Sequence, residues 1–191
     1  LERLISNLSE TPLLLKLMSV CPLPDLELEA VFTDIRSALL ASVTEIENSP
    51  EVLRFQSALA LQCFTNEYVY NQNDKETTAL AALEAEVGEA LLKGEQPRPQ
   101  SILCLATYKA LHQYKWCDLL ALTSSIEEVV TRQIFEPKQE SLLKSNMLVL
   151  QEITNKVSSK VREQYEESPY PRWVNMGLSL KPALFSKATK G

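Results

Sequence analysis

Apolar side chains recur along most of this sequence at the three- and four-residue spacing of an amphipathic helix. Phe32, Ile35 and Leu39, for example, fall on one face of such a helix, and this periodicity is the main sequence signal of helical structure. The sequence has neither the alternating runs that predict strands nor the Asn-Gly and Asp-Gly turns of hairpins. It therefore predicts an all-α protein of about eight or nine helices without a sheet, either a multi-helix bundle or an irregular helical-repeat-like stack.

Local start and stop signals divide the chain into these helices. Asp25, Ser49 and Asp74 are placed as N-caps, because their side-chain oxygens accept hydrogen bonds from the first free backbone N–H groups. Gly94 is placed to end a helix, and Glu136-Pro137 is expected to break one. We expect helices over 12–20, 26–43, 50–70, 75–93, 100–112, 116–122, 125–135, 139–150 and 155–167.

The helix expected over 50–70 is apolar nearly all round. Phe55 and Leu59 belong to one apolar stripe, and Leu53 and Ala60 belong to another. A helix with apolar residues on two sides lies in the interior of a protein. We therefore expect this helix to form the centre of the core.

The length of 191 residues is that of one domain. We expect an N-terminal helical segment at 1–24, a helical domain at 25–167, and an extended Pro-rich linker at 168–191 that leads towards a domain outside this chain. The chain starts at Leu1, and its last residues carry no packing pattern. Both ends are therefore expected to be cuts from a longer protein.

Composition narrows the classes of function. The four glycines among 191 residues are about 2%, against a usual 7% or so, which argues against a Rossmann-type or P-loop enzyme within this chain. The formal net charge of −6 disfavours a nucleic-acid partner. No stretch approaches about 18 apolar residues, so we expect no membrane span and no membrane partner. The four widely spaced cysteines form no CxxC pair, which predicts free thiols in a reducing, cytoplasmic location.

Candidate catalytic chemistry is sparse. His112 is the single histidine, and its position near the end of an expected helix favours a role in balancing the helix dipole over phosphotransfer. The neighbouring acids Glu127 and Glu128 point about 100° apart on a helix, so they do not converge on one substrate atom. We therefore assign no catalytic, cofactor-binding or metal-binding residue in this chain.

The most unusual segment is the run from Val161 to Trp173, where a helix gives way to two closely spaced X-Pro pairs. Each residue before a proline avoids the helical region, so this backbone is expected to be extended. Aromatic rings and a guanidinium on such a segment are typical interface anchors. We expect interface roles for Tyr165, Tyr170, Arg172 and Trp173. The alternative is that Trp173 folds back onto its own domain.

The string Tyr165-Glu-Glu-Ser-Pro-Tyr-Pro-Arg-Trp173 resembles the "QYEENPYPRW" signature of a bacterial family. In that family, proteins that resemble tetratricopeptide-repeat proteins are joined to a class I S-adenosylmethionine-dependent methyltransferase domain, and the signature lies just before the methyltransferase. This sequence has Ser168 where asparagine is usual. The segment 59–70 is similar to a matching stretch in the same family.

The resemblance implies that this chain is a non-catalytic helical accessory domain. Its expected roles are docking the downstream methyltransferase domain, recruiting that enzyme's protein or small-molecule substrate, or self-association. The cofactor S-adenosylmethionine would belong to the downstream domain, because the 18 residues that follow Trp173 contain only the isolated glycines Gly177 and Gly191 and a methyltransferase site needs a parallel sheet with a glycine-rich loop. The alternatives are a free-standing helical adaptor that binds a protein or peptide in a groove and, less favoured, an enzyme acting on a small molecule.

Overall fold

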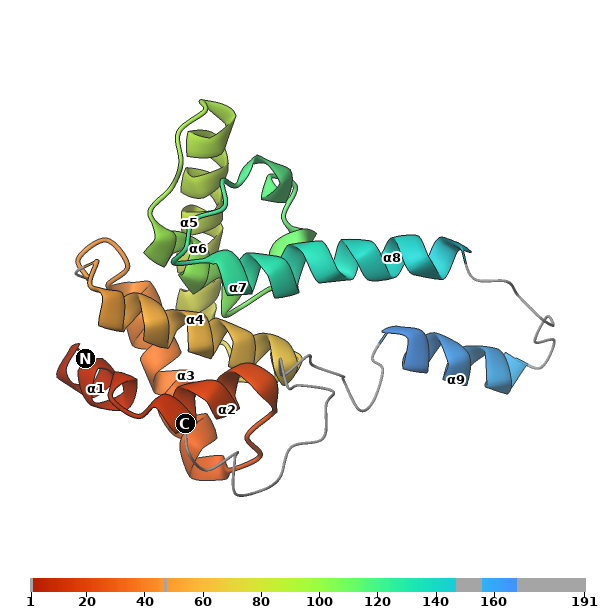
Figure 1. Cartoon of the computed structure of the whole chain (residues 1–191), viewed down its shortest axis with the longest axis horizontal. Coiled ribbons are helices and arrows are strands. Elements are labelled where there is room, and N and C mark those ends of the chain that lie inside the picture. Colours follow the sequence, from red (N-terminus) through yellow and green to blue (C-terminus); the bar gives the residue numbers. More distant parts are fainter. Residues whose placement is uncertain (1, 47, 147–155, 168–191) are drawn as a thin grey trace, which may run out of the picture.

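The structure is a computed structural model of the chain and describes residues 2–46, 48–146 and 156–167. All regular structure in these residues is helical (Figure 1), which confirms the all-α prediction. The α-helices are α1 (Glu2–Ser9), α2 (Pro12–Val20), α3 (Leu26–Ala41), α4 (Pro50–Thr65), α5 (Asp74–Leu92), α6 (Pro99–Ala106), α7 (Glu127–Val130), α8 (Glu136–Asn146) and α9 (Lys156–Glu167). Two 3-10 turns, Leu111–Gln113 and Cys117–Leu119, and one π-helical turn, Thr131–Phe135, lie between α6 and α8.

Helix ends that depend on local capping lie close to their predicted positions. The Asp25 carboxylate accepts hydrogen bonds from the backbone N–H groups of Glu27 and Leu28 at the start of α3. The Ser49 hydroxyl accepts from the N–H of Val52 at the start of α4. Gly94 follows α5 with a φ of +82°, a left-handed conformation that glycine adopts without a Cβ penalty.

The predicted cap of α5 is wrong by one residue. Asn73, not Asp74, is the N-cap, and its side-chain oxygen accepts from the N–H of Glu76 at 3.0 Å. The Glu76 carboxylate accepts in return from the N–H of Asn73 at 2.9 Å. This reciprocal pair is a capping box, and it outweighs the single cap that Asp74 would supply.

Helix α4 is the centre of the core, as its two apolar stripes predict. One cluster of buried side chains joins it to α1, α2 and α3 and includes Met18, Phe32 and Phe55. A second cluster joins it to α5, α6 and α7 and includes Leu103 and Val129. Burial on two faces is therefore the reason that α4 lies between the two halves of the body (Figure 1).

Two helices end earlier than predicted. Helix α4 stops at Thr65 rather than near residue 70, because Glu67 and Tyr68 both have a φ of +59°. The N–H of Tyr68 then donates back to the carbonyl of Cys63 at 2.8 Å, as in a Schellman C-cap. Helix α6 stops at Ala106, whose carbonyl accepts from the side-chain amide of Gln133 at 3.1 Å.

The segment predicted as a helix over 116–122 contains only the 3-10 turn Cys117–Leu119. Its flanking residue Trp116 stacks on Tyr114, with ring centroids 4.6 Å apart. Aromatic packing therefore positions this segment in place of a continued helical ladder.

Pro137 does not break the chain's helical path, contrary to the prediction. Because Pro137 has no N–H, the carbonyl of Gln133 lacks its ordinary α-helical donor. His112 Nδ1 lies 3.0 Å from that oxygen and supplies the hydrogen bond, which requires the proton on Nδ1. The backbone widens into the π-helical turn and continues into α8, with Pro137 in its first turn. Helix α8 then runs outward from the body (Figure 1).

Candidate functional site

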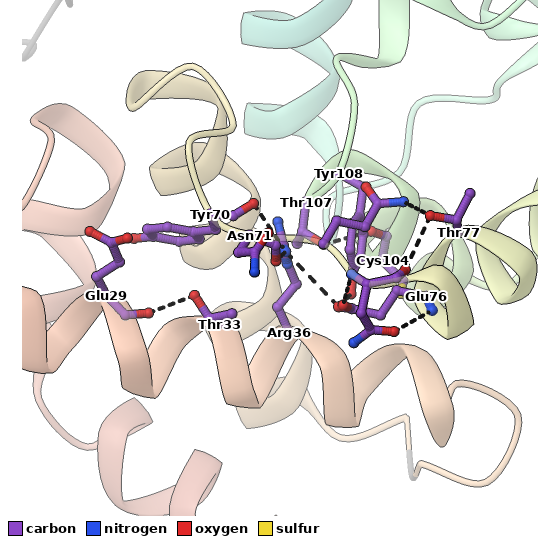
Figure 2. A network of polar contacts seen from close by, with 12 residues as sticks. Glu29, Thr33, Arg36, Tyr70, Asn71, Glu76, Thr77, Cys104, Thr107 and Tyr108 are labelled. Atoms are coloured by element: carbon purple, nitrogen blue, oxygen red, sulfur yellow. Dashed lines mark hydrogen bonds and ion pairs between the residues drawn. The ribbon is translucent and has the colours of Figure 1, made fainter.

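A buried arginine is the centre of a cluster of polar contacts in the body (Figure 2). Arg36 comes from the middle of α3 and is 2% exposed. Its Nη2 atom donates to the carbonyl of Asn71 at 2.5 Å and to that of Tyr70 at 3.4 Å, and it lies 3.9 Å from the Glu76 carboxylate. Figure 2 shows Arg36 reaching from α3 towards these groups and towards Tyr108. We call Arg36, Tyr70, Asn71, Glu76 and Tyr108 the Arg36 cluster.

Glu76 connects this cluster to two further elements. One carboxylate oxygen accepts from the Tyr108 hydroxyl at 2.6 Å, and the other closes the capping box with Asn73. The carboxylate therefore connects three elements: the start of α5, helix α3, and the segment that follows α6. The Tyr108 ring also lies over the Arg36 guanidinium, 4.1 Å from ring centroid to Cζ, within the range of a cation–π contact.

The tyrosines and buried thiols near this cluster are held in their neutral forms. Burial raises the pKa of Tyr70 to about 12, and burial together with the hydrogen bond to Glu76 raises the pKa of Tyr108 further. Burial also raises the pKa of the Cys63 and Cys104 thiols to about 12, although the Arg36 charge opposes it. A thiol nucleophile needs a lowered pKa, so the arrangement suits structural support better than catalysis.

The cluster anchors the loop between α4 and α5. Arg36 holds the backbone carbonyls of Tyr70 and Asn71, and Asn66 accepts from the N–H of Tyr68 at 3.2 Å. These contacts hold the two residues of positive φ, Glu67 and Tyr68, in a conformation that costs roughly 1–2 kcal/mol per residue. These contacts give the polar residues after α4 the role of a loop anchor.

A groove of about 710 Å³ lies on a different part of the body. Its floor is the first part of α4, including Leu53, Ala58 and Leu61, and its walls come from α2 and from the segment at the start of α7. The volume is in the range of ligand and peptide sites. Its polar lining includes Ser9, Lys16, Ser19, Asn48, Arg54, Ser57, Ser124, Ser125 and Glu128.

Three of the serines in this groove, Ser9, Ser19 and Ser57, use their hydroxyl protons within the protein. The Ser9 hydroxyl donates to backbone carbonyls at 2.7 and 3.0 Å, and the Ser57 hydroxyl donates to the carbonyl of Ser125 at 3.1 Å. Arg54 lies 3.7 Å from the carboxylate of Glu51. The groove thus presents both signs of charge around an apolar floor, which is compatible with a peptide and points to no catalytic chemistry.

The last two helices differ from the body in their exposure. Helix α8 has no buried residue, and Leu142 and Leu143 are 65% and 60% exposed. Phe135, just before α8, is 50% exposed. On α9, Val157, Val161 and Tyr165 are exposed at four-residue spacing, which places them along one face of the helix.

Of the predicted interface residues, the structure describes Tyr165, which is 62% exposed on α9. Tyr170, Arg172 and Trp173 lie outside the described residues. Their interface roles stay predictions, and so does the alternative in which Trp173 folds back. Sequence reasoning had missed the Arg36 cluster and the groove; the spacing of Asn73 and Glu76 was the one local signal of the cluster.

Two features are absent from the described parts of the chain. No helix among them is long and apolar enough to cross a membrane. They contain no group of three or more His, Cys, Asp or Glu side chains placed to hold a metal ion. His112 is exposed and bonds through Nδ1 to the backbone of the π-helical turn, which gives it a structural role.

Comparisons of the chain with family models, curated proteins and solved structures give no match. The resemblance to the region before a methyltransferase domain therefore rests on the motif at 165–173 and on the segment 59–70.

Proposed function

We propose that this chain is a non-catalytic helical interaction domain whose last two helices, α8 and α9, contact a protein partner. The observation that carries the proposal is the exposure of the apolar side chains on these helices. Most large apolar residues of α4 and α6, by contrast, are enclosed in the core. We call α8 and α9, together with Phe135, the C-terminal arm.

The exposed apolar side chains of the arm lie together along helix faces and are not scattered over the surface. Phe135 and Leu142 are seven residues apart and share a face, with Leu143 beside them. Apolar side chains that gather on one exposed face are typical of protein contact sites. A short helix that buries few of its side chains is also marginal in water, so a partner that covers the arm would stabilise it.

The body supports a scaffold role for the rest of the chain. Its charged centre, Arg36, is surrounded by carbonyls, a carboxylate and an aromatic ring that belong to the fold itself. The neighbouring tyrosines and thiols have raised pKa values, so they are poor acids and bases near neutral pH. This chemistry favours a rigid support over an active site.

The partner suggested by the resemblance is a class I methyltransferase domain that follows this region in the same polypeptide. S-adenosylmethionine would bind in that domain, and no cofactor is assigned to this chain. Tyr165, at the last turns of α9, would then act together with Tyr170, Arg172 and Trp173 as the anchors of the docked enzyme. The proposal includes substrate recruitment by the same surface.

The size of the native protein tests this partner. An antibody against the helical body should detect, in source cells, a polypeptide well above 21.5 kDa, and mass spectrometry should find methyltransferase sequence after residue 191. Within that polypeptide, Trp173→Ala should weaken docking while leaving the unfolding free energy of the helical body nearly unchanged. A native band at 21.5 kDa would contradict attachment to an enzyme.

A free-standing adaptor is the second candidate, and the groove between α2, α4 and α7 is the observation that favours it. Its apolar floor and mixed-charge rim suit a peptide segment of a partner. In that case the native mass is 21.5 kDa. Titration of the partner's peptide should then shift the amide NMR signals of residues such as Leu53 and Ala58, whereas signals from α5 should stay unchanged.

A further inference from the structure

We propose that two copies of this chain associate through their C-terminal arms, with α8 and the first two turns of α9 from each copy forming an antiparallel four-helix bundle. The inference rests on the proposed role of the arm as a contact surface, and it names a second copy as the partner. The bundle does not include the last turns of α9, so Tyr165 stays available to act with Tyr170, Arg172 and Trp173 in docking the following domain. Three properties of the arm support it: its apolar stripes, its charges and its size.

Both helices present an apolar stripe. The stripe of α8 consists of Leu142 and Leu143, with Phe135 just before the helix, and the shorter stripe of α9 consists of Val157 and Val161. All five side chains are between 44% and 71% exposed. One copy of the chain therefore leaves both stripes open to water, although helices bury such stripes against each other in bundles.

On one flank of each stripe the charges have opposite signs, whereas Lys138, on the other flank of α8 beside Leu142, pairs with Asp118. Glu136 and Glu140 lie on the flank of α8 next to Leu143, because positions 136, 140 and 143 are neighbours on the helix surface. Lys160 lies on the flank of the α9 stripe, next to Val157 and Val161. An α8 that packs against the α9 of the other copy places Glu140 close to Lys160. Two-fold symmetry repeats this pair, so each charge contributes twice.

The size of the surface favours a second copy over a hairpin within one chain. Helices of 11 and 12 residues are marginal as an isolated pair, whereas four of them make a bundle with an interior. Two copies supply ten apolar side chains, which at roughly 100 Å² each bury about 1,000 Å², near the lower bound for a specific interface. One chain alone supplies half of that.

The test is sedimentation velocity of the full 191-residue chain between about 1 and 200 µM. The proposal predicts a concentration-dependent species of twice 21.5 kDa. Leu142→Asp and Val161→Asp should each leave a single species of 21.5 kDa at these concentrations. Leu92→Asp is the matched control, because Leu92 is 80% exposed on α5, and it should associate like the wild type.

Variants that reverse a charge at the proposed dimer interface test the association without changing the apolar side chains. Glu140→Lys should raise the dimer dissociation constant about tenfold, since a symmetric dimer gains two repulsive pairs. The added change Lys160→Glu should restore it. A wild-type chain that stays at 21.5 kDa at 200 µM, or a Leu142→Asp chain that associates normally, overturns the proposal. A further outcome is a chain that stays monomeric while a photo-crosslinker at Tyr165 still captures the methyltransferase domain. That result would refute self-association but support the proposal that the arm contacts a protein partner.

Discussion

Replacing Arg36 by methionine is expected to destabilise the fold more than almost any other polar substitution in the body. The change keeps an unbranched apolar stem but removes the charged hydrogen bond to the Asn71 carbonyl at 2.5 Å and the cation–π contact with Tyr108 at 4.1 Å. It also leaves the carboxylate of Glu76, which is 5% exposed, without its cation. Removing one partner of a buried ion pair costs about 3–5 kcal/mol, and we expect a loss of about 4 kcal/mol.

The loss is measured by urea unfolding followed by far-UV circular dichroism. With an m-value of about 2 kcal/mol/M, the midpoint should fall by about 2 M. Arg98→Met is the matched control: Arg98 donates to the carbonyls of Thr44 and Ile46 at 2.9 and 3.0 Å but pairs with no buried acid among the described residues, so it should cost about 1–2 kcal/mol. Adding Glu76→Gln to Arg36→Met should recover part of the loss, because it removes the unpaired charge. Equal losses for Arg36→Met and Arg98→Met would refute the reasoning.

Three further predictions use the same unfolding assay. Burial raises the pKa of Cys63 and Cys104 from 9.0 to about 12, so the folded state binds more protons than the unfolded state above pH 9. Stability should therefore fall between pH 9 and 10 by about 1 kcal/mol per thiol, because the unfolded thiol goes from about half to about nine-tenths ionised, and the Cys63→Ala/Cys104→Ala chain should lose this part of the pH dependence. Tyr108→Phe should cost about 1.5–3 kcal/mol, because it removes a 2.6 Å hydrogen bond to a buried carboxylate; a loss below 0.5 kcal/mol would contradict that role. Gly88→Ala should cost about 1–2 kcal/mol despite its better helix propensity, since the new Cβ would lie 3.1 Å from Cδ1 of the packed Trp116 ring, and a gain in stability would show that the ring yields.

Features that depend on neighbouring residues could be predicted from the sequence. Asp25 and Ser49 cap their helices within the next three residues, and Gly94 ends α5, so each signal and its effect lie in one short segment. The central place of α4 also follows from its own two stripes. These local signals are the reason that the all-α class could be predicted.

Features that depend on distant residues could not be predicted. Nothing near Pro137 in the sequence indicates that His112, more than twenty positions earlier, supplies the missing hydrogen bond, so a helix break was the natural expectation. The early end of α4 depends on positive φ at Glu67 and Tyr68, neither of which is glycine. Tertiary contacts override the local preference in both places.

The candidate sites show the same division between local and distant information. Tyr165 could be singled out by its own segment, and it is exposed on α9. Arg36, Glu76 and Tyr108 lie 32 to 72 positions apart in pairs, and only the fold brings them together. The groove likewise takes its walls from residues 12–19 and 124–128, which no sequence pattern connects.

The central claim, that the C-terminal arm contacts a protein, is tested most directly by site-specific photo-crosslinking in source cells. A photoreactive amino acid at Tyr165 and one at Leu142 of the native-length protein should each form a covalent product with a protein partner or with another domain of the same polypeptide. The same group at Leu26, which is 84% exposed on the body, serves as the reference for nonspecific capture. The account predicts discrete products, which mass spectrometry maps to the arm of a second copy for Leu142 and to the following domain for Tyr165. Crosslinking from both arm positions that is no stronger than from Leu26 would contradict it.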